Sequence, residues 1–370
     1  GSGLVGSEMC IRDRLSMETA NNRIEINKIN SNMTSLEKQI SDVAEMLGVS
    51  KSTVSRVING NEGVGPELRK KVMDFINEIG YQPNTIAQSL SKGRMNIVAL
   101  ILGDIRNPFY ADLTFNIQRI LNDNGYMVMV LNSEYNIDRE LEFLKLTEQF
   151  NFAGLILITA QEKAIEERLK NMEMPKVLVN RILPYYTGDS VLIDNFQAGY
   201  QATMHLIELG HRHIGFIKGP GVSSASSQRF AGYRQVLENY GFSFDEKCVF
   251  ESDLKLETGR ALAQQFLEIK ERPSAMVVVN DMTAIGFMDG CRKAGIRIPE
   301  ELSIISFDDI AMASMYGIEL TTISQHVDEM GEKAAHLMLK QLNDKDAKTE
   351  RIIMEPTLIV RKTTCECSEI

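Results

Sequence analysis

The chain has 370 residues and a formal net charge of −10, so it exceeds one typical domain and suggests two or three. Its longest uninterrupted apolar run, residues 97–102, is far shorter than the ~18 residues of a membrane span, so we expect no membrane helix. Five cysteines, scattered and without an export signal, indicate reduced thiols and a cytoplasmic protein.

Residues 1–35 are predicted to be a disordered leader. Residues 1–32 lack a basic start followed by an apolar stretch and show no clear periodicity, so they resemble neither a secretion signal nor a folded segment. Met33 is a candidate native start.

Residues 36–83 are predicted to form a small helical domain. In the stretch 39–59, a first helix carries apolar residues on one face at helical spacing, namely Ile40, Val43, Ala44 and Leu47. Gly48 follows where a left-handed helix end favours glycine, and Val49 supplies an apolar plug for the turn. Ser50 is a good N-cap for a second helix, whose expected inner residues are Val54, Val57 and Ile58.

The outer face of this second helix is polar and basic. Arginine can bind guanine bidentately in the major groove, and serine and threonine can hold phosphate. We therefore interpret the pair as a helix-turn-helix that reads DNA, with an ordinary helical hairpin as the alternative.

A third helix is predicted to begin at Pro66 and end at Gly80. Its expected buried face is formed by Leu68, Val72, Phe75, Ile76 and Ile79, and its expected solvated residues are Arg69, Lys70 and Lys71. Residues 84–94 follow as a hinge helix or linker, in which Asn84 can cap one short helix over 85–91. Such a helix is marginal alone and is expected to form against DNA or a symmetry mate, with a plain linker as the alternative.

The negative charge belongs to the larger part of the chain. Residues 33–94 contain eight Lys/Arg and seven Asp/Glu, a net +1, and residues 1–32 balance at zero, so residues 95–370 carry −11. DNA binding must then depend on where the basic residues sit and on doubling by dimerisation.

From residue 97 the pattern changes to short apolar strands that alternate with amphipathic helices. The expected strands are 97–102, 127–131, 154–158, 177–179, 214–217, 276–279 and 303–307. The expected helices include 111–124, 139–149, 198–209, 231–239, 257–269 and 283–294. Fully apolar strands between helices indicate parallel sheets covered on both faces. We predict an α/β fold with two doubly wound lobes and a ligand at the carboxyl ends of the strands.

Motifs along the chain resemble the lactose-repressor/galactose-repressor family of bacterial transcription regulators. They are Asp-Val-Ala (42–44), Gly-Val-Ser (48–50), Thr-Val-Ser-Arg-Val-Ile-Asn (53–59), Gly-Tyr-Gln-Pro-Asn (80–84), Asn-Pro-Phe-Tyr (107–110), Gly-His-Arg-His-Ile (210–214), Arg-Phe-Ala-Gly-Tyr (229–233), Asn-Asp (280–281), Phe-Asp-Asp (307–309) and Thr-Thr-Ile (321–323). The resemblance covers about residues 39–364. It implies a helix-turn-helix headpiece, a hinge helix, and a core like that of periplasmic sugar-binding proteins, in which the chain crosses between the lobes three times.

On this resemblance, the effector-binding core spans 95–364. The N-lobe is placed at 95–193 and 327–353, the C-lobe at 194–326 and 354–364, and a tail at 365–370. The implied DNA-binding residues are Ser50, Lys51, Ser52, Thr53, Ser55, Arg56, Asn59, Asn84, Ala87 and Leu90. Among these, Lys51, Ser52 and Arg56 match base-reading positions, and Leu90 matches the hinge leucine that wedges into the minor groove.

The implied effector-binding residues are Asp104, Asn107, Phe109, Asn180, Arg181, Arg229, Asn280, Asp281, Asp308 and Gln325. Carboxylates, amides and arginines around an aromatic ring suit a sugar, whose hydroxyls need paired donors and acceptors while its carbon face stacks on the ring. A sugar or sugar phosphate is the first expectation, and a nucleoside or purine-type corepressor is the alternative. Each carboxylate could instead be a helix cap or an ion-pair partner.

Two rival functions fit less well. A sugar-binding transport protein would need an export signal and no helix-turn-helix. An enzyme would need a dinucleotide fingerprint, a phosphate-binding loop or a nucleophile elbow, and the sequence contains none of these motifs. No catalytic residue, cofactor or metal is predicted. His211 and His213 are expected to have surface or interface roles, and Cys365 and Cys367 to belong to the tail although they could bind a metal.

The sequence therefore predicts a homodimeric repressor on a pseudo-palindromic operator. Effector binding in the core would change the angle between the lobes and the spacing of the hinge segments, altering DNA affinity by ~1–3 kcal/mol or somewhat more. Either an inducer or a corepressor is consistent with the residues.

Overall fold

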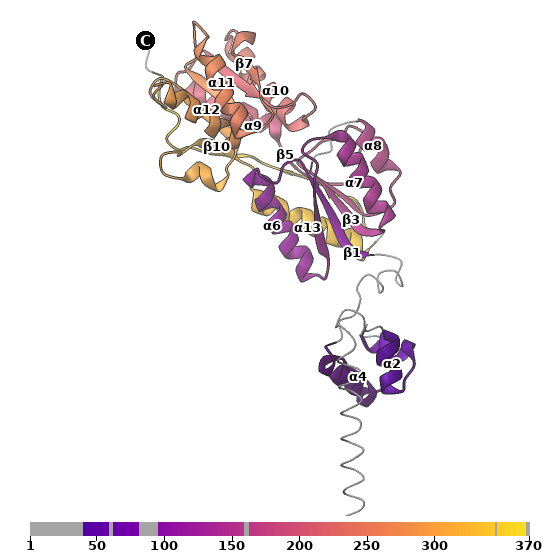
Figure 1. Ribbon diagram of the computed structural model, residues 1–370. Helices are drawn as coiled ribbons and strands as arrows, with labels where there is room; N and C mark the ends of the chain where they lie inside the picture. Colours follow the sequence, from indigo (N-terminus) through magenta and orange to yellow (C-terminus); the bar gives the residue numbers. More distant parts are fainter. Residues whose placement is uncertain (1–39, 59–61, 81–94, 159–162, 345, 368–370) are drawn as a thin grey trace, which may run out of the picture. The chain divides into compact units, whose positions relative to one another are not determined.

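The computed structural model describes residues 40–58, 62–80, 95–158, 163–344 and 346–367 (Figure 1). By its internal contacts the chain divides into residues 1–93 and residues 94–370. The predicted leader and hinge segment, with Asn59, Asn84, Ala87 and Leu90, lie outside the described residues.

The headpiece is a bundle of three helices, as predicted. These are α2 (Ile40–Leu47), α3 (Lys51–Ile58) and α4 (Pro66–Glu78). One apolar cluster joins them, with Val43, Ala44, Val54, Val57, Val72 and Ile76 at its centre. Gly48 has a φ of 68°, the left-handed conformation that the tight turn between α2 and α3 requires. Arg69 departs from its predicted solvated position, because it is half-buried and its Nη1 lies 3.5 Å from the carbonyl oxygen of Val57.

The first lobe is built on a six-stranded parallel sheet in the order β11-β5-β4-β3-β1-β2. Its strands are β1 (Met95–Leu102), β2 (Met127–Asn132), β3 (Phe152–Leu157), β4 (Lys176–Val179), β5 (Asp189–Ile193) and β11 (Arg351–Met354). Its helices are α6 (Pro108–Asp123), α7 (Ile137–Gln149), α8 (Lys163–Lys170) and α13 (Val327–Asn343). Alternate residues of β1 face opposite ways, Val98 and Leu100 toward α6 and α13, and Ala99 and Ile101 toward α7 and α8 (Figure 1).

The second lobe repeats this plan in the order β12-β10-β9-β8-β6-β7, with β12 antiparallel. Its strands are β6 (Ile214–Lys218), β7 (Val249–Glu251), β8 (Ala275–Val278), β9 (Ser303–Asp308), β10 (Thr321–Ser324) and β12 (Thr357–Ile359). Its helices are α9 (Asn195–Glu208), α10 (Ser224–Tyr240), α11 (Leu256–Leu267), α12 (Asp281–Lys293) and the short η1 (Glu246–Cys248) and η2 (Ala311–Ser314). The α9 and α10 helices pack on one face, and α11 and α12 on the other.

The chain passes between the lobes three times, as the predicted fold requires. The passages follow β5, β10 and β11, and they lead into α9, α13 and β12. Five strands lie outside the predicted set, namely β5, β7, β10, β11 and β12. These strands are short or contain polar residues, such as Thr321 and Thr322 of β10, so they lack the apolar run by which the others were predicted.

All six core helices named in the prediction begin earlier than predicted, and α6, α9 and α10 begin three or more residues earlier. Asn107, Asp194 and Ser223 cap α6, α9 and α10, and each side chain accepts a hydrogen bond from a backbone N–H of the first turn. Capping placed these starts three to seven residues ahead of the apolar periodicity. Among the described helices, none combines the length and apolar character needed to cross a membrane.

The structure differs from two further predictions. His211 is not at the surface, because it is buried and its two ring nitrogens lie 2.8 Å from the Ser274 hydroxyl and 3.0 Å from the Ser303 hydroxyl. Residues 365–367 of the predicted tail are held against the second lobe, where the Cys367 N–H donates to the carbonyl oxygen of Leu209 at 2.7 Å.

Candidate functional site

The second headpiece helix, α3, presents its polar side chains to solvent. Lys51, Ser52 and Arg56 are exposed, while Val54 and Val57 on the opposite face are buried. The base-reading candidates are therefore available to a partner without any change in the headpiece core.

The start of α3 is fixed by the predicted cap. The Thr53 N–H donates to the Ser50 hydroxyl at 3.1 Å, and the hydroxyls of Ser52 and Thr53 each lie 2.8 Å from that same oxygen. Three hydroxyl groups are thus gathered at the positive end of the helix dipole, where a phosphate is bound favourably. Ser55 is half-buried one turn further along.

Most of the predicted effector residues line one cavity of about 30 Å³, formed by segments of both lobes. From the predicted set it includes Asn107, Phe109, Asn180, Arg181, Arg229, Asn280, Asp308 and Gln325. Asn180 and Arg181 follow β4, Asn280 follows β8, Asp308 is the last residue of β9 and Gln325 follows β10, so these five lie at the carboxyl ends of strands, the edge at which open α/β sheets bind ligands. Asn107 and Phe109 lie after β1 at the start of α6, and Arg229 lies in α10. This cavity is far smaller than the ~300–1,000 Å³ of typical small-molecule pockets.

Five buried side chains form a closed ring of polar contacts around this cavity. Arg229 Nε donates to Asn195 Oδ1 at 2.8 Å, and Asn195 Nδ2 donates to Asn180 Oδ1 at 3.2 Å. Asn180 Nδ2 donates to Gln325 Oε1 at 2.6 Å, and Gln325 Nε2 donates to Asp308 Oδ1 at 2.5 Å. The ring closes where Arg229 Nη1 lies 3.8 Å from Asp308 Oδ1. Asn180 extends from the first lobe, so the ring ties the two lobes together.

Burial weakens the charged forms of the ion pair in this ring. It lowers the pKa of Arg229 to about 10, although the Asp308 carboxylate opposes the shift. It raises the pKa of Asp308 to about 7, although the Arg229 guanidinium opposes that shift. Arg229 is also stacked on Phe307, with its guanidinium carbon 4.6 Å from the ring centre.

The backbone is strained where the ring meets the ends of two strands. Asn180 has a φ of 52° and Asp308 a φ of 118°, both in the region that residues other than glycine rarely adopt. Such strain concentrates at ligand sites because the surrounding structure must hold it.

Arg181 lies beside the ring with part of its guanidinium unsatisfied. Its Nη2 donates to the Tyr110 hydroxyl at 3.1 Å and its Nη1 to the carbonyl oxygen of Asn180 at 2.6 Å. Its Nε is buried, and among the described residues it has no hydrogen-bond partner. A buried unpaired donor costs ~1–3 kcal/mol, so the site has an unmet need for an acceptor.

Asp104 lies in a neighbouring cavity of about 160 Å³ that shares Asn107 and Leu254 with the first. Its carboxylate accepts from Arg106 Nη2 at 2.7 Å, and this hydrogen bond holds the pKa of Asp104 below its usual value. Asn107 and Asn280 use their side-chain oxygens to cap α6 and α12, so only their remaining polar atoms are available to a ligand.

Asp281 does not line either cavity. It is fully buried, and its carboxylate accepts hydrogen bonds from the hydroxyls of Ser306 and Thr322 and, at 2.9 Å, from the backbone N–H of Ile310. Its oxygens are therefore used within the second lobe, where they hold α12 to β9 and β10. Asp281 therefore has a structural role in this lobe, and its binding role stays a prediction.

The sequence did not single out three further residues of the site. Asn195 links Arg229 to Asn180 by hydrogen bonds. The Tyr110 hydroxyl accepts a hydrogen bond from Arg181. Ser226 lines the cavity, and its hydroxyl accepts from the Gly219 N–H at 2.8 Å. Tyr110 follows Phe109 in the Asn-Pro-Phe-Tyr motif, which was a usable signal. Asn195 and Ser226 lie in the first turns of α9 and α10, the segments that the periodicity missed.

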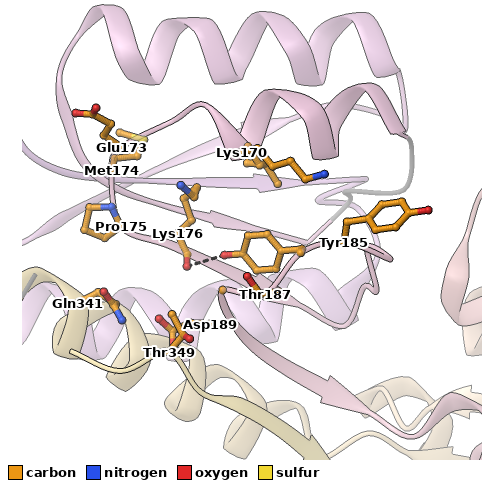
Figure 2. A pocket seen from close by; sticks show the side chains of 13 residues that line it. Lys170, Glu173, Met174, Pro175, Lys176, Tyr185, Thr187, Asp189, Gln341 and Thr349 are labelled. Carbon is orange, nitrogen blue, oxygen red and sulfur yellow. Dashed lines mark hydrogen bonds between the residues drawn. The ribbon is translucent and has the colours of Figure 1, made fainter. Parts of the chain in front are cut away.

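A larger cavity, of about 410 Å³, lies at the amino ends of β4 and β5 (Figure 2). Lys170, Lys176 and Tyr185 are among its lining residues, and the Lys170 ammonium stands 5.0 Å from the centre of the Tyr185 ring. None of the predicted effector residues lies there. Size alone would favour this cavity as the effector site. The smaller cavity between the lobes (the cleft) is favoured by its position at the carboxyl ends of the strands, by its buried polar groups and by its strained backbone.

Comparisons with known proteins identify a family for each of the two parts of the chain. The family described as bacterial regulatory proteins, lacI family, matches residues 39–84, and the periplasmic binding protein-like domain matches residues 203–364. The HTH-type transcriptional regulator DegA of Bacillus subtilis (strain 168) is 33% identical over 334 residues, which cover 89% of this chain and 98% of that protein.

Two solved structures extend the likeness over most of the fold. A lac repressor dimer bound to operator and the anti-inducer ONPF matches with a TM-score of 0.79 and 26% identity, covering 89% of this chain and 99% of that one. A complex of the transcriptional regulator CelR with cellobiose matches with a TM-score of 0.67 and 28% identity, covering 88% and 100%.

Proposed function

The chain belongs to the LacI family of bacterial regulatory proteins and is a DNA-binding transcriptional regulator, and we propose that it is a homodimeric repressor controlled by a sugar or sugar phosphate. The effector occupies the cleft between the two core lobes. The repressor acts in the cytoplasm. Its operator is pseudo-palindromic, because a dimer with two-fold symmetry reads two half-sites.

The exposed face of α3 supports the DNA-binding part of this proposal. Arg56 and Lys51 can reach base edges, and the hydroxyls gathered around Ser50 can hold a phosphate. The headpiece segment has little net positive charge, so one head alone binds DNA weakly. Two heads on one operator double the number of phosphate contacts, as in the solved lac repressor dimer on its operator.

The ring of buried polar side chains is the single observation that carries the effector proposal. Its members offer donors and acceptors in alternation, which is what vicinal hydroxyl groups require. The unpaired Arg181 Nε adds a donor for a hydroxyl or a phosphate oxygen, and Phe109 supplies an aromatic wall. The related regulator CelR was solved with cellobiose, which supports the same ligand class.

The ring also provides a mechanism of control. A cavity of about 30 Å³ cannot hold a sugar, so binding requires the lobes to part and the Asn180–Gln325 bond to break. Effector binding then favours an arrangement of the lobes that differs from the one in this structure. The difference in free energy between the two arrangements changes the affinity for the operator. The sign of that change distinguishes an inducer from a corepressor.

A thermal-shift screen of the whole protein tests the proposal. Sugars, sugar phosphates and nucleosides are compared, and a ligand present at 100 times its Kd is expected to stabilise the fold by ~2.7 kcal/mol. Operator affinity, on a DNA site selected from random sequence, is then measured with and without that ligand. Stabilisation by nucleosides alone would favour the purine-type alternative, and a shift with no change in operator affinity would contradict effector control.

A matched pair of variants locates the ligand. Asn180→Asp keeps a residue that tolerates the left-handed backbone but replaces the amide donor that Asn180 would offer to a ligand once it has parted from Gln325, so the thermal shift is expected to fall. Asn151→Asp is the control, because Asn151 is also left-handed (φ 50°) but exposed and outside the cleft. An equal shift in both variants would place the ligand elsewhere.

A further inference from the structure

Three potential metal ligands from two segments of the second lobe converge away from the cleft. His213 precedes β6, and Asp245 and Cys248 lie at the two ends of η1. The His213 Nε2 is 3.4 Å from the Cys248 Sγ, and the Cys248 Sγ is 3.7 Å from the Asp245 Oδ2. All three ligand atoms lie within 4.8 Å of one another.

In the described part of the chain, the atoms that face one another form hydrogen bonds only within the cluster, while other atoms of the three residues hold the cluster in place. Asp245 caps η1 through Oδ1, which accepts from the Lys247 N–H at 2.9 Å, and this leaves Oδ2 turned toward the thiol. The Cys248 N–H donates to the Asp245 carbonyl oxygen at 3.0 Å, and its side chain is buried. The backbone of His213 is anchored where its carbonyl oxygen accepts from the Ser274 N–H at 3.1 Å.

The cluster differs from an ordinary surface ion pair. In the described part of the chain, no lysine or arginine side chain pairs with Asp245, although such a partner would be the usual way to neutralise a carboxylate. The thiol is enclosed, while His213 and Asp245 remain half-exposed and leave a path for an ion.

We propose that His213, Asp245 and Cys248 bind one Zn²⁺ ion. Imidazole nitrogen, thiolate sulfur and carboxylate oxygen are all zinc ligands, and a thiolate with a carboxylate balances the two positive charges of the ion. Zinc–ligand bonds of ~2.0–2.3 Å in a tetrahedron place neighbouring ligand atoms roughly 3.4–3.6 Å apart. The observed 3.4 and 3.7 Å therefore need little adjustment.

Three protein ligands leave the fourth position to water or another exchangeable group. Binding releases the proton of the Cys248 thiol and links the amino end of β6 to η1 and the edge strand β7. The effector cleft lies at the opposite, carboxyl end of β6, so the ion is predicted to stabilise the lobe and not to occupy the effector site.

The experiment uses the full-length chain with Cys10, Cys365 and Cys367 replaced by serine, so that only Cys248 and Cys291 remain as thiols. The chelator-treated protein is titrated with Zn²⁺ by calorimetry and with Co²⁺ by absorption. One equivalent is expected to bind, with the visible bands of tetrahedral Co²⁺ and the near-ultraviolet band of a cobalt–thiolate bond. Zn²⁺ is expected to displace the Co²⁺ and to raise the melting temperature.

Variants assign the ligands. His213→Gln and Cys248→Ser are expected to weaken Zn²⁺ binding at least about 10-fold and to remove the melting-temperature rise, and Asp245→Asn to weaken it less. His326→Gln and Cys291→Ser are controls that should leave binding unchanged. Half-exposed His213 is the decisive position, because its replacement is not expected to unfold the lobe. No binding in the triple-serine protein, or unchanged binding in folded His213→Gln, would overturn the proposal.

Discussion

The base-reading candidates of the headpiece are exposed to solvent, whereas the polar side chains of the cleft are buried. On α3, Lys51 and Arg56 point into solvent from a helix whose stability comes from the other face. In the cleft, Arg229, Asp308 and Asn180 are buried, and they are joined through Asn195 and Gln325 in one ring of polar contacts. A DNA partner can therefore meet a surface that is already formed, whereas an effector must replace contacts that the protein makes with itself.

This difference predicts different costs of mutation. A side chain that faces water contributes to binding and little to stability, whereas a member of a buried polar network contributes to both. The following predictions test that contrast, and the first three, all substitutions, run from the largest expected effect to the smallest.

Arg229→Ala is expected to lower the free energy of unfolding by about 3–5 kcal/mol. It leaves Asp308 buried without its cation and the carbonyl oxygen of Val279 without the donor now at 2.7 Å. Urea unfolding of the purified protein measures the loss. Arg234→Ala is the control, because Arg234 is exposed on the same helix and its guanidinium only stacks on the Phe244 ring, so its effect should stay within about 1 kcal/mol. Similar losses in both variants would mean that the buried ring is not what distinguishes the cleft.

Gly199→Ala tests how the ring is positioned. A Cβ at residue 199 of α9 would overlap the carbonyl oxygen of Arg229 on α10, so the two helices would have to move apart. Overpacking of this kind costs about 1–3 kcal/mol, and it should also weaken effector-induced thermal stabilisation. Gly221→Ala is the control, since its Cβ would meet open space and its backbone is not left-handed. Thermal unfolding that is equal in the two variants would contradict this role for Gly199.

Arg56→Ala should affect DNA binding more than it affects the stability of the protein. Loss of one bidentate base contact is expected to reduce discrimination between operator and random DNA by about 1–3 kcal/mol, while the stability of the headpiece changes by less than about 0.5 kcal/mol. Binding titrations on both DNA types at fixed salt measure the first quantity, and unfolding measures the second. Lys71→Ala on α4 is a control for simple loss of charge, and it should weaken both DNA types equally.

The same contrast explains what could be predicted from the sequence. The helix-turn-helix depends on local sequence signals, because its cap, its turn glycine and its apolar spacing all lie in residues 39–59. The helices α2 and α3 accordingly follow the predicted bounds closely. The apolar strands β1, β3, β8 and β9 were likewise visible as runs, and their alternation with helices correctly indicated parallel sheets.

The polar parts of the core were less visible, because their partners are distant in sequence. In the sequence, Asp281 and Asp308 both look like residues of a binding site. Only the fold shows that the Asp281 carboxylate already accepts hydrogen bonds from Ser306, Thr322 and Ile310, whereas Asp308 lines the cavity. Asn195 was missed because its importance comes from Arg229, 34 residues away. The cluster of His213 with Cys248 was missed for the same reason, since 35 residues separate the two.

A change of pH tests the contrast in a different way from the three substitutions. Burial raises the pKa of Asp308 from 3.8 to about 7 in the folded protein, so the folded state holds this proton more tightly than the unfolded state does. Its contribution to stability is then complete below about pH 4 and is lost as the pH rises toward 7. Arg229, with a pKa of about 10, stays charged throughout this range and does not mask the change.

Asp308→Asn removes this titration while keeping an oxygen that can accept the Gln325 bond. The stability of the variant relative to the natural protein should therefore increase from about pH 4 to about pH 7 and then level off. Asp281, whose pKa burial raises to about 6, repels the ionised Asp308 carboxylate and adds to the rise of its pKa, so the difference between the two proteins includes this interaction. Urea unfolding at several pH values gives the two curves. If they run parallel, Asp308 is ionised in the folded state across the whole range, and the ring is an ordinary ion pair that an effector need not neutralise.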